Sequence, residues 1–144
     1  MKMNILFVCT GNTCRSPMAE AILYSKKLPG VEVKSAGIYA NSGSATSPQA
    51  QIVLEEHGIA FDHRSTALSE EHIEWATYIL TMTNQHKQSI IFQYPHAQEK
   101  TFSLKEFADE DGDIIDPFGG SVPMYEQTFK ELKRLIERIV EKKL

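Results

Sequence analysis

The segment VCTGNTCRSP, residues 8–17, combines residue types that could together handle a phosphoryl group. Cys9 and Arg15 are separated by five residues, which can form an arc whose backbone N–H groups converge on one phosphate-sized anion. Gly11 permits the backbone geometry that such a loop demands, and Asn12 tolerates a left-handed conformation. The sequence therefore predicts an anion-binding loop that presents a cysteine.

The chemistry expected of this loop is nucleophilic catalysis. A helix that begins near Pro17 would point the positive end of its dipole at the bound anion, so we expect Cys9 to be a thiolate near neutral pH. The guanidinium of Arg15 can hold two phosphoryl oxygens, and the Ser16 hydroxyl can donate to the Cys9 sulfur. In-line attack on phosphorus would give a phosphocysteine that water hydrolyses. Asp116, in an Asp-Pro step of a flexible loop, is the candidate general acid.

The elements around the loop must place it at the end of a buried strand. Residues 4–8 are apolar and β-branched without alternation, as in a parallel strand that is buried on both faces. Ser16 and Pro17 are typical of a helix N-cap and first helical residue, which predicts a helix that ends near Lys27. Further strands are expected at residues 31–35, 78–81 and 100–104, and further helices at 49–57, from Ser69, at 84–94 and from Pro123 onward.

Strands that alternate with helices predict an α/β fold, a four-stranded parallel sheet with helices on both faces, in a single domain over residues 1–144. In such sheets, ligands bind beyond the carboxyl ends of strands where the chain order reverses, and the loop after the first strand lies at such an end. The C-terminal helix has an apolar stripe with spacings of three and four, made by Tyr125, Phe129, Leu132, Ile136, Ile139 and Val140.

Composition argues against several other classes of protein. The net charge of −4 is unlike that of a nucleic-acid-binding face or a polybasic membrane anchor. The apolar run at residues 5–9 is too short for a signal peptide or a membrane span. Two cysteines are too few for a disulfide scaffold, which favours a reducing cytoplasmic setting. We expect a cytoplasmic monomer.

Other kinds of binding site find little support in the sequence. Neither glycine-rich nucleotide-binding motif occurs, and zinc would need two ligands besides Cys9 and Cys14. The acidic stretch at residues 108–113 lacks the length and terminal glutamate of a calcium loop and is typical of a solvated turn. The five histidines have no ligand spacing: we expect His57 and His63 to be hydrogen-bonded loop residues, and His72, His86 and His96 to be surface residues.

The stretches VCTGNTCRSPMAEA and DPFGG resemble the low-molecular-weight protein tyrosine phosphatases, and the resemblance covers essentially the whole chain. It implies a four-stranded parallel sheet, phosphorylated proteins as partners and no metal or other cofactor. It also implies that Cys9 is the nucleophile, that Arg15 binds the phosphoryl group and that Asp116 is first general acid and then base. The positions that would brace the phosphate loop, in which Asn12 is held, are Ser16, Ser35 and His63.

The same resemblance also bears on which phosphorylated residue is the substrate. Tyrosine phosphatases of the family commonly have an aliphatic residue where Thr13 stands, a tryptophan near Asn41 and a second aromatic residue after Phe118. CTGNTCRS with DPFGG is instead similar to the bacterial protein-arginine phosphatases. Thr13 would narrow the pocket and offer a polar contact, and Phe118 can stack on a planar guanidinium. The residues expected to contact the substrate are Thr10, Gly11, Asn12, Thr13, Cys14, Ser16 and Phe118.

The predicted function is therefore hydrolysis of protein phosphoarginine, with protein phosphotyrosine as the alternative. Thioredoxin-linked arsenate reductases share the fold and loop but need two further cysteines beyond Cys9 and Cys14. A non-catalytic phosphoprotein-binding module would need neither a nucleophile nor an acid. We also expect Cys14 to form a disulfide with oxidised Cys9 under peroxide; the alternative is that Cys14 only fills space beneath the loop.

Overall fold

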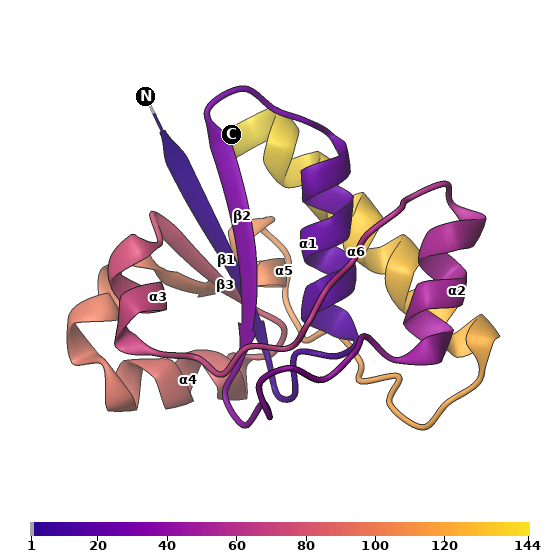
Figure 1. The fold of residues 1–144 in the computed structure, drawn as a ribbon. Coiled ribbons are helices and arrows are strands. Elements are labelled where there is room, and N and C mark those ends of the chain that lie inside the picture. Colours follow the sequence, from indigo (N-terminus) through magenta and orange to yellow (C-terminus); the bar gives the residue numbers. More distant parts are fainter. Residues whose placement is uncertain (1) are drawn as a thin grey trace.

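The computed structural model describes residues 2–144 and contains one four-stranded parallel sheet (Figure 1). Its strands are β1 (Met3–Cys9), β2 (Val31–Gly37), β3 (Tyr78–Thr81) and β4 (Thr101–Ser103), in the spatial order β2-β1-β3-β4. The chain order therefore reverses at β1, because β2 lies on one side of it and β3 on the other. The predicted fold class is confirmed, and the loop after β1 lies at this switch point.

Helices cover both faces of the sheet (Figure 1). Ile5, Phe7 and Cys9 of β1 belong to the larger core cluster, and Leu6 and Val8 belong to the smaller one on the opposite face. This alternation explains why β1 is apolar at every position from Ile5 to Cys9. The larger cluster includes residues of α1 (Arg15–Ser25), α2 (Pro48–Glu56) and α6 (Val122–Lys143), and the smaller one includes residues of α3 (Glu70–Trp75) and α4 (Asn84–Gln93).

The predicted start of the first helix is wrong by two residues, and the predicted serine cap is wrong as well. α1 begins at Arg15 with Cys14 as N-cap, and no side chain caps it. Ser16 lies inside the helix because its hydroxyl bonds to the Cys9 sulfur and the Asn12 amide instead of to a backbone N–H. The helix ends at Ser25, and Lys27, where the predicted helix ended, has a left-handed φ of 48°.

Two short helical segments were not predicted. The 3-10 helix Pro95–Lys100 and the helix α5 (Leu104–Phe107) flank β4, which is one residue shorter at each end than the predicted strand. The start of α5 carries a capping box in which the Ser103 hydroxyl accepts from the backbone N–H of Glu106. This Ser-x-x-Glu signal was visible in the sequence.

Three of the histidines lie away from the phosphate loop. His57 follows α2 and bonds to a Glu126 carboxylate oxygen at 2.8 Å, as expected of a hydrogen-bonded residue. His96 is exposed, as predicted. His72 is half-buried instead of a plain surface residue, because its Nδ1 accepts from the backbone N–H of Ser69 in the capping box of α3.

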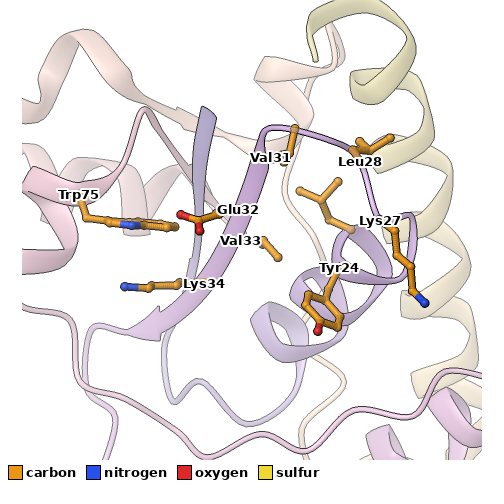
Figure 2. Close-up of a pocket in the computed structure, with 9 residues that line it drawn as sticks. Tyr24, Lys27, Leu28, Val31, Glu32, Val33, Lys34 and Trp75 are labelled. Atoms are coloured by element: carbon orange, nitrogen blue, oxygen red, sulfur yellow. The ribbon is translucent and has the colours of Figure 1, made fainter. Parts of the chain in front are cut away.

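The free edge of β2 borders a hollow of about 500 Å³ (Figure 2). Its walls include Tyr24 near the end of α1, Trp75 at the end of α3 and Lys34, whose Nζ lies 4.5 Å from the centre of the Trp75 ring. This hollow lies beside the amino-terminal half of β2 and is therefore distant from the carboxyl ends of the strands. Among residues 2–144, no helix is both long and apolar enough to cross a membrane.

Candidate active site

The loop between β1 and α1 opens into a cavity of about 230 Å³. The cavity combines this loop with a segment a hundred residues later in the chain, because the stretch that follows α5 folds back over the start of α1. The backbone N–H of Ile114 anchors that stretch by donating to the carbonyl of Met82, which follows β3. The residues that line the cavity are Cys9, Thr10, Gly11, Thr13, Cys14, Arg15, Asp116 and Phe118.

Arg15 is buried, and its guanidinium has a fixed orientation. Nη1 donates to the carbonyl oxygen of Ile114 at 2.9 Å, and Nη2 lies 3.6 Å from Oδ2 of Asp116. The first bond holds the guanidinium plane against the loop that carries Asp116, so the cation and the carboxylate face one cavity. A bound phosphoryl group would therefore meet a preorganised fork of donors.

Asp116 and Phe118 form the mouth of the cavity. The Asp116 carboxylate is half exposed and accepts at Oδ1 from the backbone N–H of Phe118 at 3.0 Å. The Phe118 residue is 76% exposed although it is aromatic. An exposed ring beside a carboxylate at a cavity mouth can contact the part of a ligand that follows its phosphate.

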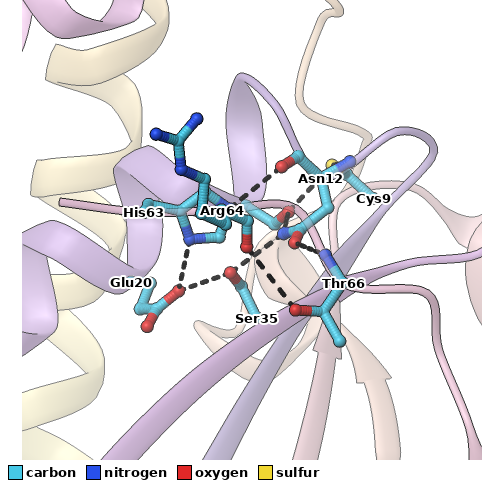
Figure 3. A network of polar contacts seen from close by, with 8 residues as sticks. Cys9, Asn12, Glu20, Ser35, His63, Arg64 and Thr66 are labelled. Atoms are coloured by element: carbon cyan, nitrogen blue, oxygen red, sulfur yellow. Dashed lines mark hydrogen bonds and ion pairs between the residues drawn. The ribbon is translucent and has the colours of Figure 1, made fainter. Parts of the chain in front are cut away.

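Asn12 is the centre of a buried network behind the loop (Figure 3). Its Oδ1 accepts from the backbone N–H of Thr66 at 2.9 Å, and its Nδ2 donates to Ser16 Oγ at 2.8 Å and to Ser35 Oγ at 2.9 Å. Its φ of 56° is left-handed, as the sequence predicted. Gly11 is not left-handed, and a Cβ there would meet Thr13 Oγ1 at an ordinary 3.7 Å, so the loop backbone does not require glycine at that position.

These bonds determine which way the Ser16 hydroxyl donates. The Thr66 N–H must bond to the amide oxygen of Asn12, so the amide nitrogen must face Ser16. Ser16 Oγ therefore accepts from Asn12 and is free to donate its hydrogen to Cys9 Sγ, 2.9 Å away. The backbone N–H of Asn12 also donates to Cys9 Sγ at 3.3 Å. Two donors therefore converge on the Cys9 sulfur.

The other side of the network ends on Glu20, which the sequence analysis missed (Figure 3). The Ser35 hydroxyl donates to Glu20 Oε1, and His63 Nδ1 lies 3.5 Å from the same oxygen. His63 Nε2 donates to the backbone carbonyl of Asn12 at 3.1 Å. Glu20 therefore orients the two side chains that hold Asn12. In the sequence, nothing about its position on the helix sets Glu20 apart from the acidic residues of the surface.

Gly37 is a second residue that the sequence analysis missed. A Cβ at this position would lie 2.7 Å from the carbonyl oxygen of Thr10 and 2.9 Å from the backbone nitrogen of Asn12. The end of β2 therefore touches the phosphate loop so closely that only glycine fits. The glycine of the stretch SAG was the available signal.

The predicted surface position of His86 is wrong. His86 is buried on α4, and its Nε2 lies 2.9 Å from Thr10 Oγ1 on the phosphate loop. Burial, with a further contribution from the positive charge of Arg15, lowers the pKa of His86 to about 4. The imidazole is therefore uncharged near neutral pH and supports the loop as a neutral group.

Cys14 is also buried beneath the loop, and both cysteines are free thiols. Burial and the neighbouring Cys9 raise the pKa of Cys14, so its thiol is protonated near neutral pH. The two cysteines line one cavity but have different surroundings, because Cys9 Sγ has the Ser16 and Asn12 donors described above.

The structure divides the residues predicted to contact substrate into two groups. Thr10, Gly11, Thr13, Cys14 and Phe118 line the cavity. Asn12 and Ser16 do not: both are fully buried behind the loop, where their side chains bond to each other and, like Ser35 and His63, support it. Among residues 2–144, three metal-ligating side chains come together only at the surface, in Glu70, Glu74 and His96, away from this cavity.

The chain is similar to known phosphatases over nearly its whole length. The family model for low molecular weight phosphotyrosine protein phosphatases matches residues 4–144. A protein-arginine-phosphatase from Geobacillus stearothermophilus is 56% identical over 143 residues, which make up 99% of this chain and 97% of that protein. The low molecular weight protein-tyrosine-phosphatase PtpB of Staphylococcus haemolyticus (strain JCSC1435) is 42% identical over 137 residues, 95% of this chain and 97% of that protein.

A solved structure adds a chemical detail. A mutant of YwlE arginine phosphatase with a phosphorylated active site serine has a TM-score of 0.94 and 45% sequence identity, and the match covers 97% of this chain and 95% of that one.

Proposed function

The chain belongs to the low molecular weight phosphotyrosine protein phosphatase family, and we propose that it hydrolyses protein phosphoarginine through a phosphocysteine at Cys9. The observation that carries the proposal is the geometry around one sulfur. Cys9 Sγ accepts from Ser16 and from the backbone of Asn12, and it lines one cavity with Arg15 and Asp116. The relatives named arginine phosphatases, at 56% identity, support the substrate class.

The first step transfers the phosphoryl group to the enzyme. Arg15 and the inward backbone N–H groups hold the phosphoryl oxygens while Cys9 Sγ attacks phosphorus from the side opposite the leaving nitrogen. The S–P bond forms as the P–N bond breaks. The carboxylic acid of Asp116 gives its proton to the departing guanidine nitrogen, so the substrate protein leaves with an unphosphorylated arginine side chain.

The second step releases phosphate. The Asp116 carboxylate, deprotonated in the first step, takes a proton from a water molecule as the water oxygen attacks phosphorus. The S–P bond breaks, inorganic phosphate leaves and Cys9 returns to the thiolate. The Ser16 hydroxyl bonds to the sulfur both when it attacks and when it departs.

The preference for phosphoarginine rests on Thr13, Asp116 and Phe118. Thr13 lies in the wall of the cavity. Its hydroxyl and methyl would narrow the space beyond the phosphorus of a bound substrate. The exposed Phe118 ring can stack on a planar guanidinium. The side chain of Asp116 can accept hydrogen bonds from the N–H groups of that guanidinium. Phosphotyrosine is the second candidate, since the relative PtpB is named a tyrosine phosphatase.

The test compares phosphoarginine and phosphotyrosine peptides of one sequence. We expect wild type to have the larger kcat/KM for phosphoarginine, and Thr13→Ile to lower that value and raise the value for phosphotyrosine. Cys9→Ser should lose turnover yet still bind vanadate, and Arg15→Lys should fail on both peptides because a point charge does not replace a fork of donors. A wild type that prefers phosphotyrosine would overturn the substrate assignment, and an active Cys9→Ala would overturn the mechanism.

The setting predicted from sequence is part of the same proposal: a cytoplasmic monomer that acts on phosphorylated proteins and binds neither nucleic acid nor membrane. The cysteine chemistry proposed here fits a reducing compartment.

A further inference from the structure

A second hollow adjoins the catalytic cavity and has no part in the chemistry above. Its volume is about 730 Å³, and it lies between the turn that follows β2 and the outer face of α4. Thr10 connects the two sites: its carbonyl accepts from the backbone N–H of Tyr39, and its hydroxyl bonds to His86 of α4. The side chains that line this hollow, which we call the α4 groove, are Ile38, Tyr39, Gln85, Gln88, Ser89, Ile91, Phe92 and Gln93.

The face that α4 turns to this groove is unusual for a surface helix. Its buried residues are His86 and Ile90, one turn apart. A single stripe on another side of the helix contains Gln85 and the residues three, four and seven positions after it, which are Gln88, Ser89 and Phe92. All eight residues that line the groove are uncharged, in a chain with 24% charged residues. An uncharged surface of amides and rings fits neither a nucleic acid nor an anionic lipid.

Two aromatic rings stand on opposite walls of the groove without a packing role. Phe92 is 90% exposed and Tyr39 is 80% exposed. A single exposed aromatic residue is common, but two of them across one uncharged hollow offer the rings and amides that protein interfaces favour.

We propose that the α4 groove binds the polypeptide that flanks the phosphorylated residue of the substrate. The inference rests on the proposed function and specifies how the enzyme holds a protein instead of a free phosphorylated side chain. The catalytic cavity, at about 230 Å³, has room for little more than one side chain and its phosphate, so the adjoining residues must lie outside it. The groove lies next to the cavity because Tyr39, which lines the groove, bonds to Thr10, which lines the cavity. Its glutamines can bond to the backbone of an extended chain while its rings contact apolar side chains.

The test uses substrates that differ only in flanking chain: N-acetyl phosphoarginine amide, and a peptide of about a dozen residues with phosphoarginine at its centre. Phe92→Ala should lower kcat/KM for the peptide about tenfold, mainly by raising KM, and leave the value for the blocked residue unchanged within about twofold. Phe92→Tyr, which keeps the ring, should restore the peptide value. Because Phe92 is so exposed, its replacement should not disturb folding.

Tyr24→Ala is the matched control. Tyr24 is also an exposed aromatic residue (62%) that borders a large hollow, but that hollow lies by the amino-terminal half of β2 (Figure 2). This variant should leave both substrates unaffected.

The same pair of substrates is measured with phosphotyrosine, so that docking is tested whichever headgroup the enzyme prefers. If Phe92→Ala changes the peptide and the blocked residue equally, or changes neither, the groove does not hold the substrate chain. Wild type could hydrolyse only the phosphotyrosine pair, with Phe92→Ala lowering kcat/KM for the peptide but not for the blocked residue. That result would support the groove as the docking site and overturn the phosphoarginine assignment.

Discussion

Replacing Asn12 should separate the support of the phosphate loop from its chemistry. Asn12 is fully buried, and Asn12→Ala removes three of its side-chain hydrogen bonds, to Thr66, Ser16 and Ser35. At about 1 kcal/mol net for each bond, the loss is about 3 kcal/mol. The left-handed φ of 56° adds about 1 kcal/mol, because a Cβ without a local polar contact disfavours it. We expect the free energy of unfolding to fall by about 4 kcal/mol, the sum of these contributions.

Two further substitutions distinguish the contributions. Asn12→Gly loses the same bonds, but glycine adopts the left-handed backbone conformation without strain. It should therefore be no less stable than Asn12→Ala, once about 0.5–1 kcal/mol of extra chain entropy lost on folding is allowed for. Asn12→Asp keeps an acceptor for the Thr66 N–H but no longer donates to Ser16. Its carboxylate would draw the Ser16 hydrogen away from Cys9 Sγ. We therefore expect this variant to lose about a hundredfold in kcat/KM while retaining more stability than Asn12→Ala.

Urea unfolding and hydrolysis of para-nitrophenyl phosphate measure the two properties independently of substrate specificity. The reasoning is refuted if Asn12→Ala unfolds within about 1 kcal/mol of wild type, since the three bonds would then contribute almost nothing. It is also refuted if Asn12→Asp keeps most of its activity, because the direction of the Ser16 hydrogen would then be irrelevant to the thiolate.

Gly37→Ala should destabilise the protein by about 2 kcal/mol and lower kcat/KM, because its Cβ would displace the backbone of the phosphate loop; urea unfolding and steady-state kinetics measure both, and a wild-type result would mean that the loop yields freely. The pKa of His86 is lowered from 6.5 to about 4, so the unfolded chain binds its proton first, and the free energy of unfolding should fall as the pH drops from 6.5 towards 4. Urea unfolding across this range should show a shallower fall in His86→Gln, and equal slopes would contradict the assignment. Peroxide-treated wild type should recover activity with a thiol reductant while Cys14→Ser recovers poorly; because burial and Cys9 raise the pKa of Cys14, disulfide formation should speed up above neutral pH, and equal recovery of the two proteins would remove the protective role.

Strong local patterns account for what could be predicted of the fold. The continuous apolar run of β1 and the alternating helices and strands led to the correct parallel sheet, because strands buried on both faces must be apolar throughout. The start of α1 was misplaced because the hydroxyl of Ser16 has other partners in the folded loop. Ser16 has the residue type of an N-cap, but its hydroxyl is used by Cys9 and Asn12.

The candidate site could be predicted only where one segment contains its residues. Cys9 and Arg15 belong to one loop whose residue types are rare in that combination, and Asp116 was found through its Asp-Pro step and the family resemblance. Glu20, Gly37 and the buried position of His86 were not predicted. An acid on a helix, a glycine at the end of a strand and a histidine near a helix start are each common and carry no distinctive signal.

The sequence by itself determined the order along the chain of the four strands and of all helices except the 3-10 helix and α5. It also determined the loop between β1 and α1 and the chemical class of its cysteine and arginine. These depend on contacts between near neighbours, which residue types and spacing encode directly. Only the tertiary structure decided how that loop is held: Thr66 on the Asn12 amide, Ile114 on the Arg15 guanidinium and His86 on Thr10. These contacts join residues 54 to 99 positions apart, and they exist because a parallel sheet brings the carboxyl ends of its strands to one edge, where the loops that follow them must pack together.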